Sequence, residues 1–340
     1  DLSASVKAYF ALKLTGDDPT APHMRRARDL ILGLGGAARA NVFTRYTLAL
    51  FGQAPWRASP VMPVELMLLP RWFPFHLSKV SYWSRTVIAP LVKLRALNPR
   101  AKNPRGVDIR ELFVVPPEEV QDYIRSPKGG RVGQAFIALD RLLRMLEPHT
   151  PAWLRKRALK AADDFIEKRL NGEDGLGGIF PAMANALMAM HAQGVSPADP
   201  SYRAARAAIE KLVIDDGDQS YCQPCLSPVW DTGLAMHALM EAGEPGQGDA
   251  LRSACDWLAA REVTTLKGDW ATRRPGLEPG GWAFQYENAH YPDVDDSAVI
   301  GMALHRADAA RHRAPLERTA RWIVGMQCRN GGWGSFDADN

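Results

Sequence analysis

The sequence has few cysteines and no long apolar run. Four cysteines among 340 residues exclude a scaffold built on disulfides. No stretch reaches the ~18 consecutive apolar residues of a membrane-spanning helix, and no charged segment followed by an apolar core indicates a secretory signal. Cys222 and Cys225 have the C-x-x-C spacing of zinc ligands, but no second pair of cysteines or histidines stands nearby. We therefore interpret these cysteines as reduced thiols and expect no metal site.

Net charge is also low, because the formal value is +4. The basic excess is concentrated between Val61 and Arg100, where Glu65 is the single acid. The bases of this stretch stand among many aromatic residues and are Arg71, Lys79, Arg85, Lys93, Arg95 and Arg100. No helix-turn-helix, zinc-finger or RNA-binding pattern accompanies them, so we expect no nucleic-acid partner. Two interpretations remain open: contact with an anionic membrane surface, or a solvated helix face over core aromatics.

Apolar residues recur mainly at spacings of three and four, which is typical of amphipathic helices. Such runs cover 6–14, 24–32, 43–51, 152–170, 183–190, 202–213, 232–240, 251–260, 297–304 and 316–326. Alternating patterns long enough for strands are absent, and the loops are rich in Gly, Pro, Asp and Asn. The sequence therefore predicts an all-α fold built from helical hairpins, with the length of about two domains.

An internal repeat marks the ends of several of these helices. Its clearest copy is Trp322-x-x-x-x-Gln327-x-x-x-Gly331-x-Trp333. A degenerate copy has Trp257, Arg261, Gly268 and Trp270, and a weaker one has Phe165, Arg169 and Gly175. In each copy a helix end is followed by a glycine turn, and in the first two an aromatic residue then returns to the helix. We expect the Gln to bond the backbone at the start of the next helix, with the Trp stacked over it.

The repeat resembles the QW repeat of triterpene cyclases, and segment 279–296 contains a D-x-D-D motif like that of class II terpene cyclases. Segments 227–233 and 324–334, with Asp1-Leu-Ser and Val42-Phe-Thr-Arg45, are also similar to squalene–hopene cyclases. The resemblance runs the whole length and implies two α/α-toroid domains, the double α-barrel of that family. Residues 1–225 would form most of one barrel and 226–340 part of the second. The family chain is longer, so we expect this sequence to lack its beginning and last third, and to be inactive alone.

The D-x-D-D motif consists of Asp293, Asp295 and Asp296, directly before a helical run. Three carboxylates this close repel one another, so at least one should keep its proton and serve as a Brønsted acid. Helix N-terminal N–H groups can stabilise the anion that is left. Taken alone, the motif also fits an Asp-rich helix cap. The resemblance assigns proton donation to Asp295, with Asp293 and Asp296 as supporting carboxylates and a histidine partner beyond Asn340.

A carbocation formed by this acid needs stabilisation without a nucleophile, which aromatic faces provide. The resemblance places two cation-stabilising residues at Phe284 and Trp230. At a third position, Phe336, a well-studied bacterial member of the family has a tyrosine, so the π-face is kept and the hydroxyl is lost. We interpret Trp257, Trp322 and Trp333 as clamp or core residues.

A second acidic motif has a different interpretation. Asp163, Asp164 and Glu167 imitate the D-D-x-x-E magnesium site of class I terpene synthases. They lie on a helix rich in Lys and Arg, where i,i+4 pairing explains the charges. The second metal motif that class I chemistry needs is absent from the sequence. We therefore assign this motif to the surface.

The segment 131–147 is amphipathic. Apolar residues from Val132 to Leu146 share one face, and Lys128, Arg131, Arg141 and Arg144 flank it. This pattern is typical of a helix that lies in a membrane surface, and the resemblance places the family's membrane helix here. A buried core helix is the alternative.

The resemblance implies an isomerase that protonates squalene and cyclises it to hopene, with hopanol also possible, in hopanoid biosynthesis. It implies no cofactor, a monotopic position on the cytoplasmic face of the cell membrane, and is compatible with a homodimer. A class II diterpene cyclase would use the same acid on a pyrophosphate substrate. A protein prenyltransferase β subunit needs a zinc-binding Cys where Ser297 stands. A non-catalytic toroid binding module would have no use for the D-x-D-D motif.

Overall fold

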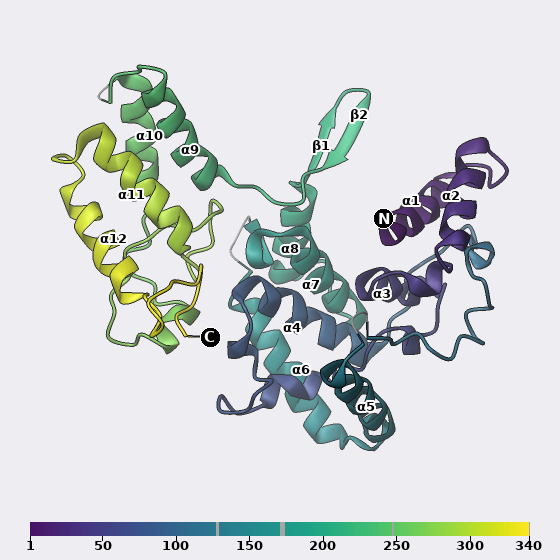
Figure 1. The fold of residues 1–340 in the computed structure, drawn as a ribbon. Coiled ribbons are helices and arrows are strands. Elements are labelled where there is room, and N and C mark those ends of the chain that lie inside the picture. Colours follow the sequence, from purple (N-terminus) through teal and green to yellow (C-terminus); the bar gives the residue numbers. More distant parts are fainter. Residues whose placement is uncertain (127–128, 171–173, 247, 340) are drawn as a thin grey trace. The chain divides into compact units, whose positions relative to one another are not determined.

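The computed structural model describes residues 1–126, 129–170, 174–246 and 248–339, which form mostly helices (Figure 1). This confirms the all-α prediction. The helices are α1 (Leu2–Thr15), α2 (Pro22–Gly33), α3 (Val42–Leu50), α4 (Tyr82–Leu97), α5 (Arg131–Leu146), α6 (Ala152–Glu167), α7 (Phe180–Gln193), α8 (Pro200–Glu210), α9 (Pro228–Glu241), α10 (Asp249–Ala259), α11 (Val294–Asp308) and α12 (Arg313–Gly325). None of the helices in these parts of the chain combines the length and apolar character needed to cross a bilayer.

The chain packs as two compact units. Unit 1 comprises Asp1–Val64 and Leu94–Lys156, and unit 2 comprises Glu65–Lys93 and Arg157–Asn340. Residues 127–128, 171–173, 247 and 340 lie outside the described residues, and Lys128 is among them. The expected division into barrels near residue 225 stays a prediction.

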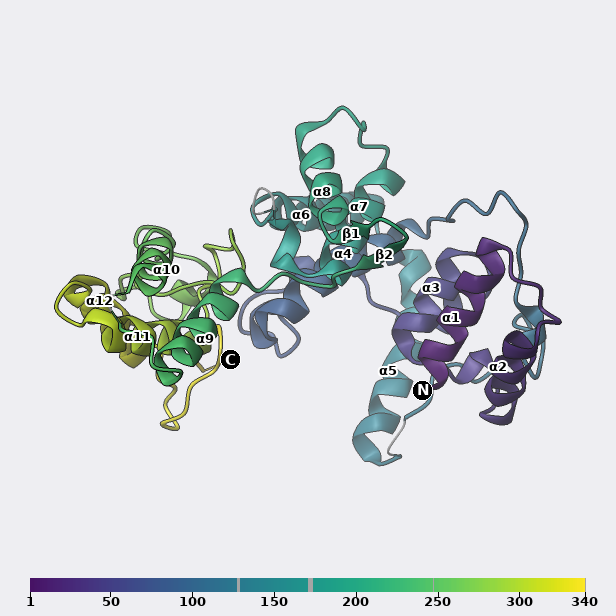
Figure 2. The ribbon, with the colours of Figure 1, turned by 90° about the horizontal axis from the view of Figure 1, so that it is seen from above.

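The core of unit 1 forms where α1 packs against α2 and α3 (Figure 2). Asp1 caps α1 by accepting a hydrogen bond from the Ala4 amide at 2.8 Å, which satisfies a donor that a helix start leaves free. Val6 and Phe10 lie four residues apart on one face of α1 and are buried against Met24 and Leu48. The i,i+4 spacing that predicts the helix therefore also predicts which face is buried.

Helix α5 of unit 1 has its polarity inverted. Its buried residue is Asp140, whose carboxylate accepts a hydrogen bond from the Val61 amide at 2.7 Å and pairs with Arg144 at 2.7 Å. Its apolar face is exposed instead, at Val132, Phe136, Leu142, Met145 and Leu146. Within unit 1, the interpretation of this segment as a core helix is therefore wrong.

Two groups of helices carry the cores of unit 2. Helices α6, α7 and α8 bury Ile166, Ala186 and Met190. Helices α9, α10 and α11 bury a second set that includes Leu258 and Ile300, and α12 packs on α11. This second group places the D-x-D-D motif, because the motif begins α11.

A polar β-hairpin in unit 2 was not predicted. Strand β1 (Val213–Asp216) pairs antiparallel with β2 (Gln219–Cys222), so that Val213 faces Cys222. Gly217 turns the chain with φ 64°, a conformation that favours glycine. The hairpin side chains are mostly exposed, so no buried face produces an alternating apolar pattern. Cys222 is exposed and Cys225 partly buried, and both are free thiols.

The basic stretch is partly internal, so neither interpretation of it holds for three of its six bases. Arg85, Lys93 and Arg95 lie on α4 and are buried. Lys93 pairs with Asp163, and Arg95 with Glu147 at 3.3 Å. The predicted helical runs omit α4 because Pro90 interrupts it and its charges do not mark an exposed face.

These pairs also explain the D-D-x-x-E segment. Asp164 pairs with Lys160 one turn away at 2.9 Å, the i,i+4 pairing expected from the sequence. Asp163 differs, because it neutralises the buried ammonium of Lys93 and also accepts a hydrogen bond from Gln193 at 3.0 Å. Asp164 therefore lies at the surface, as expected, whereas Asp163 neutralises a buried charge.

The repeat closes its own turn. Gln327 Nε2 donates to the Gly331 carbonyl at 2.8 Å, and Trp333 Nε1 donates to the Ile323 carbonyl at 2.7 Å. The expectation that the Gln327 side chain bonds the backbone at the start of the next helix is therefore wrong, because its hydrogen bond goes to the glycine turn. In each degenerate copy an arginine stacks on the aromatic ring four residues earlier: Arg261 lies 3.7 Å from the Trp257 centroid, and Arg169 lies 3.9 Å from that of Phe165.

Candidate active site

The D-x-D-D motif lies between an extended segment and the first turn of α11. Asp293 is the N-cap of α11, and its Oδ1 accepts a hydrogen bond from the Asp295 amide at 2.7 Å. The Asp293 amide donates to the Trp282 carbonyl at 2.7 Å. Ser297 Oγ joins the same two segments, since it donates to the Asp293 carbonyl at 2.6 Å and accepts from the Trp282 amide at 2.9 Å. The backbone of the motif is therefore fixed from both sides.

Two of the three carboxyl groups are buried. Burial, followed by repulsion from Asp293 and Asp295, raises the pKa of Asp296 to about 8. Burial also raises the pKa of Asp293 to about 6, although the hydrogen bond from the Asp295 amide opposes the rise. Asp296 is 1% exposed, and its Oδ1 has no hydrogen-bond partner within the described residues. At pH 7 the cluster therefore holds a proton on Asp296, while most of Asp293 is ionised.

Asp295 is the exposed member of the motif. Its Oδ2 accepts a hydrogen bond from Ser335 Oγ at 2.9 Å, and the Ser335 carbonyl accepts from the Val294 amide at 2.8 Å. A carboxylate here also lies at the positive end of the α11 dipole. Asp295 is thus the carboxyl of the three that a bound molecule can reach.

The predicted aromatic residues lie in one continuous series of rings. In order, the series runs through Trp230, Phe284, Trp83, Phe336, Tyr82 and Tyr291. Neighbouring centroids are 6.5 Å apart for Trp230 and Phe284, 6.2 Å for Phe284 and Trp83, and 5.4 Å for Trp83 and Phe336. Trp230, Phe284 and Phe336 therefore belong to one series of rings, and their role toward a cation stays a prediction.

Trp83, which joins the other rings, was not predicted from the sequence. Trp83 lies at the start of α4, inside the basic stretch, and is 38% exposed. An adjacent pair of aromatics, Tyr82 and Trp83, was the available signal. That signal was ambiguous because the helix around it was not predicted.

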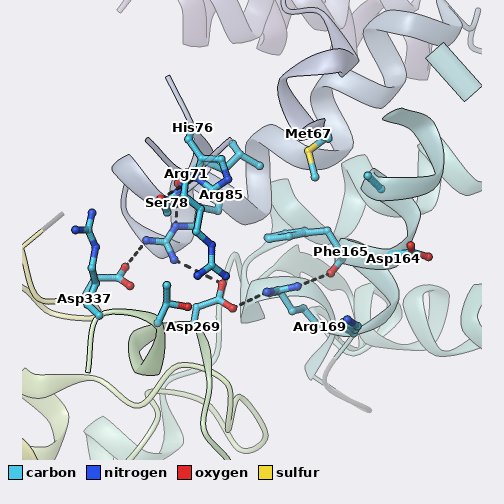
Figure 3. A pocket seen from close by; sticks show the side chains of 15 residues that line it. Met67, Arg71, His76, Ser78, Arg85, Asp164, Phe165, Arg169, Asp269 and Asp337 are labelled. Atoms are coloured by element: carbon cyan, nitrogen blue, oxygen red, sulfur yellow. Dashed lines mark hydrogen bonds and ion pairs between the residues drawn. The ribbon is translucent and has the colours of Figure 1, made fainter. Parts of the chain in front are cut away.

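Figure 3 shows a network of largely buried charges around Arg85. Arg85 pairs with Asp337 at 2.6 Å and with Asp269 at 3.5 Å, and Asp269 pairs with Arg169 at 2.5 Å. These four side chains line a cavity of about 350 Å³, together with the cations Arg71, Lys168 and Arg273.

The positive charges around this cavity affect the pKa of His76, which lines it. Burial lowers the pKa of His76, and the charges of Arg71, Arg85 and Lys79 lower it further. A cavity so rich in charge is not a place for a hydrocarbon, and none of the D-x-D-D carboxylates lines it. Within the described ranges, no three His, Cys, Asp or Glu side chains gather in a way that could hold a metal ion.

Comparison of the sequence with known proteins identifies its relatives. A sequence model of the squalene-hopene cyclase N-terminal domain matches residues 1–218, and one of the C-terminal domain matches 226–340. All of this chain aligns with squalene–hopene cyclases of Bradyrhizobium diazoefficiens and Zymomonas mobilis, at 50% identity to each. The identity to the squalene–hopene cyclase of Alicyclobacillus acidocaldarius is 38%.

The chain covers 52%, 53% and 54% of those three proteins, respectively, so it spans about half the length of the relatives it matches. The two domain models together match nearly all of its residues. On these grounds the chain belongs to the squalene–hopene cyclase family.

Proposed function

We propose that the full-length protein is an isomerase that cyclises squalene to hopene after protonating a terminal alkene. The observation that carries this proposal is the D-x-D-D cluster, in which two buried carboxyls support an accessible third. An isolated alkene is a very weak base, so its protonation needs a carboxylic acid that is held neutral until it reacts. The names of the relatives supply the substrate class, and the cluster supplies the acid.

In this proposal Asp295 donates the proton. Its carboxylate is then stabilised by the N-terminus of α11 and by the hydroxyl of Ser335, 2.9 Å away. Asp296 assists by remaining protonated, because a neutral neighbour does not repel the new anion. Asp293 holds the Asp295 amide, which fixes the direction of the donor. The acid regains its proton from solvent or from the product cation, so the reaction is an isomerisation without net proton consumption.

The rings carry the second half of the chemistry. Each aromatic face contributes roughly 0.5–2 kcal/mol to a nearby cation without forming a bond to it. Trp230, Phe284 and Phe336 are assigned this role, and Trp83 joins them on geometry. Addition of water to the last cation would give hopanol instead of hopene.

Two alternatives use the same residues differently. A class II diterpene cyclase would protonate a pyrophosphate substrate with the same acid, and its activity would need an anion site near the rings. A non-catalytic toroid module would bind a ligand without protonating it. The raised pKa of Asp296, to about 8, favours an enzyme, because a binding module gains nothing from an aspartate buried at this cost.

Helix α5 supports an attachment to the membrane surface. Squalene dissolves in lipid, so the enzyme must take it from a bilayer. The exposed side chains Val132, Phe136 and Met145 give α5 an apolar face, and Arg131 and Arg141 add positive charge beside it. We propose a monotopic position on the anionic, cytoplasmic face of the cell membrane. A homodimer, and inactivity of residues 1–340 alone, stay predictions.

Replacement of Asp295 by Asn tests the acid. In the full-length enzyme the amide cannot supply a proton, so hopene formation should fall by on the order of 10³-fold or more. The side chain is exposed and similar in shape, so the melting temperature should stay nearly unchanged. Products are extracted and quantified by gas chromatography after incubation with squalene. Hopene formation at the normal rate would refute the role of Asp295.

The pKa of Asp296 predicts how stability depends on pH. The folded pKa of about 8 lies above the ordinary value of 3.8, so between these values the folded state binds more protons than the unfolded state. The contribution of Asp296 to the free energy of unfolding should therefore be fully present below about pH 4. It should decrease as the pH rises toward 8, by at most about 1.4 kcal/mol per pH unit. Asp296→Asn should remove that decrease and raise the melting temperature most at pH 8. An equal change at pH 4 and pH 8 would contradict the raised pKa.

Phe284→Ala tests the ring series. The removal of one π-face destabilises the cation it covers, so deprotonation competes with further ring closure. We expect partly cyclised hydrocarbons beside hopene when the products are separated by gas chromatography. A slower enzyme that still makes only hopene would identify Phe284 as a packing residue.

Phe136→Glu tests the membrane face of α5. A charge on the apolar face should reduce binding of the full-length protein to vesicles that contain anionic phospholipid, by about tenfold or more. Gln134→Glu is the matched control, because it adds the same charge on the opposite side of the same exposed helix. Equal losses in a vesicle sedimentation assay would mean that net charge, and not the apolar face, governs binding.

A further inference from the structure

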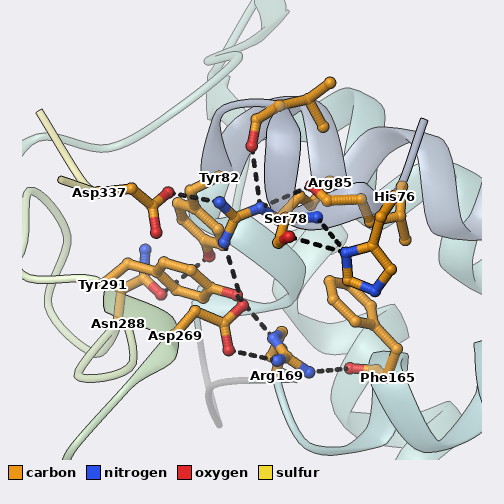
Figure 4. Close-up of polar contacts among 12 residues, drawn as sticks. His76, Ser78, Tyr82, Arg85, Phe165, Arg169, Asp269, Asn288, Tyr291 and Asp337 are labelled. Carbon is orange, nitrogen blue, oxygen red and sulfur yellow. Dashed lines mark hydrogen bonds and ion pairs between the residues drawn. The ribbon is translucent and has the colours of Figure 1, made fainter. Parts of the chain in front are cut away.

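A closed set of contacts holds the chain just before the D-x-D-D motif (Figure 4). Arg169 Nε donates to the Tyr291 hydroxyl at 2.6 Å, and Arg169 Nη2 pairs with Asp269 Oδ1 at 2.5 Å. The Tyr291 hydroxyl in turn donates to Asp269 Oδ2. Each of the three groups therefore contacts the other two. We propose that Arg169 is a positioning residue, which acts through Asp269 and Tyr291 to fix the acid for the reaction proposed above.

Tyr291 is well placed to transmit this constraint. It precedes Asp293 by two residues, and the residue between them is Pro292, whose ring fixes φ. The Tyr291 ring stacks on Tyr82, whose hydroxyl donates to Asn288 at 3.0 Å. Because the ring and the hydroxyl of Tyr291 are both held in place, the position of the backbone just before α11 is fixed. Asp293 then directs Asp295 through its bond to the Asp295 amide, at 2.7 Å.

The same network reaches the other side of the acid. Asp269 also contacts Arg85, and Arg85 pairs with Asp337 at 2.6 Å. Asp337 follows two residues after Ser335, the residue that donates to the Asp295 carboxylate. Arg85 is buried at its position on α4. The segments before and after the acid are therefore tied to one set of buried charges.

Asp269 and Arg169 stay charged at neutral pH. Burial acts to raise the pKa of Asp269, but the charge of Arg169 and the hydrogen bonds from Tyr291 and Arg169 outweigh it, so the pKa lies below its ordinary value. The side chain of Arg169 is 13% exposed and that of Asp269 is 19% exposed. Water therefore replaces a lost partner poorly, and removal of one group should release the others.

The internal repeat supplies a matched control. Arg169 and Arg261 occupy the same position in the two degenerate copies of the repeat, four residues after the aromatic residue. Each stacks on the aromatic residue four positions earlier, and each donates to the carbonyl of that residue at 3.1 Å. Arg261 has no ion pair in the part of the chain that the structure describes, whereas Arg169 pairs with Asp269. Arg169→Gln and Arg261→Gln remove the same local contacts. Only Arg169→Gln also removes the contacts with Asp269 and Tyr291.

The kinetic experiment uses the full-length enzyme with squalene. Arg169→Gln should lower kcat by on the order of 10–100-fold while KM stays within about twofold, because misplacement of the acid affects the proton transfer more than binding. Arg261→Gln should change kcat by less than about twofold. Arg169→Lys, which keeps the charge but not the fork of donors, should fall between Arg169→Gln and the wild type, and it serves if Arg169→Gln does not fold.

A double variant identifies the route. Arg169→Gln should have a much smaller effect in the Tyr291→Phe background, since the hydroxyl through which it acts is already absent. Independent, multiplicative losses would overturn the inference. Equal losses in Arg169→Gln and Arg261→Gln would do so as well, because the effect would then belong to the repeat and not to the acid.

Amide hydrogen exchange tests the same inference without substrate. The amides of Asp293 and Asp295 should exchange at least about tenfold faster in Arg169→Gln than in the wild type, and Arg261→Gln should leave them unchanged. Unchanged exchange in Arg169→Gln would overturn the positioning role. If wild-type protein makes no hopene, the proposed reaction fails, while the exchange result still decides whether Arg169 holds the motif.

Discussion

The burial of Asp296 is the constraint on which the rest of unit 2 depends. A carboxyl that is 1% exposed and lacks a partner for Oδ1 destabilises the fold, yet it keeps a proton near neutral pH. The cost is acceptable only if neighbouring segments hold the position firmly. The bridge between Trp282 and Asp293, the hydroxyl of Ser297 and the core of α9, α10 and α11 provide that support. The carboxyl group of Asp295 is exposed and lies outside this core, so it is open to a bound molecule while the buried part of the motif stays fixed.

Two regions of opposite character lie close to each other in unit 2, a series of aromatic rings and a cluster of charged side chains. The rings from Trp230 to Tyr82 offer polarisable faces and no fixed charge, which suits a cation in transit. The cluster of Arg85, Arg169, Asp269 and Asp337 offers dense fixed charge, which would trap or solvate such a cation. Tyr291 stands at the boundary: its ring stacks on Tyr82, and its hydroxyl belongs to the charged cluster. The Tyr291 side chain therefore lies between the ring series and the charged cluster and contacts both.

The sequence predicted the helical fold, the D-x-D-D motif and three of the rings, because each depends on local spacing or on a family motif. It did not predict α4, since Pro90 and three buried bases hide its periodicity. It could not separate Asp295 from Asp293 and Asp296 by exposure, which depends on segments as distant as Ser335. Arg169 resembled a degenerate clamp, and its partner Asp269 lies 100 residues away along the chain. Contacts of that range leave no periodic trace in one sequence.

The long-range contacts of Arg169, in its copy of the repeat, have a consequence for how the protein unfolds. In an array of repeats each unit ordinarily contacts its neighbours, so that local opening can spread or stop between adjacent units. The side chain of Gln327 follows that rule, because its hydrogen bond to the Gly331 carbonyl stays within one turn. Arg169 does not, because it couples the end of α6 to the turn that holds Asp269 and to the start of α11. Unit 2 should therefore lose these elements together in one cooperative step, and the acid should be among the last parts of the unit to lose its shape.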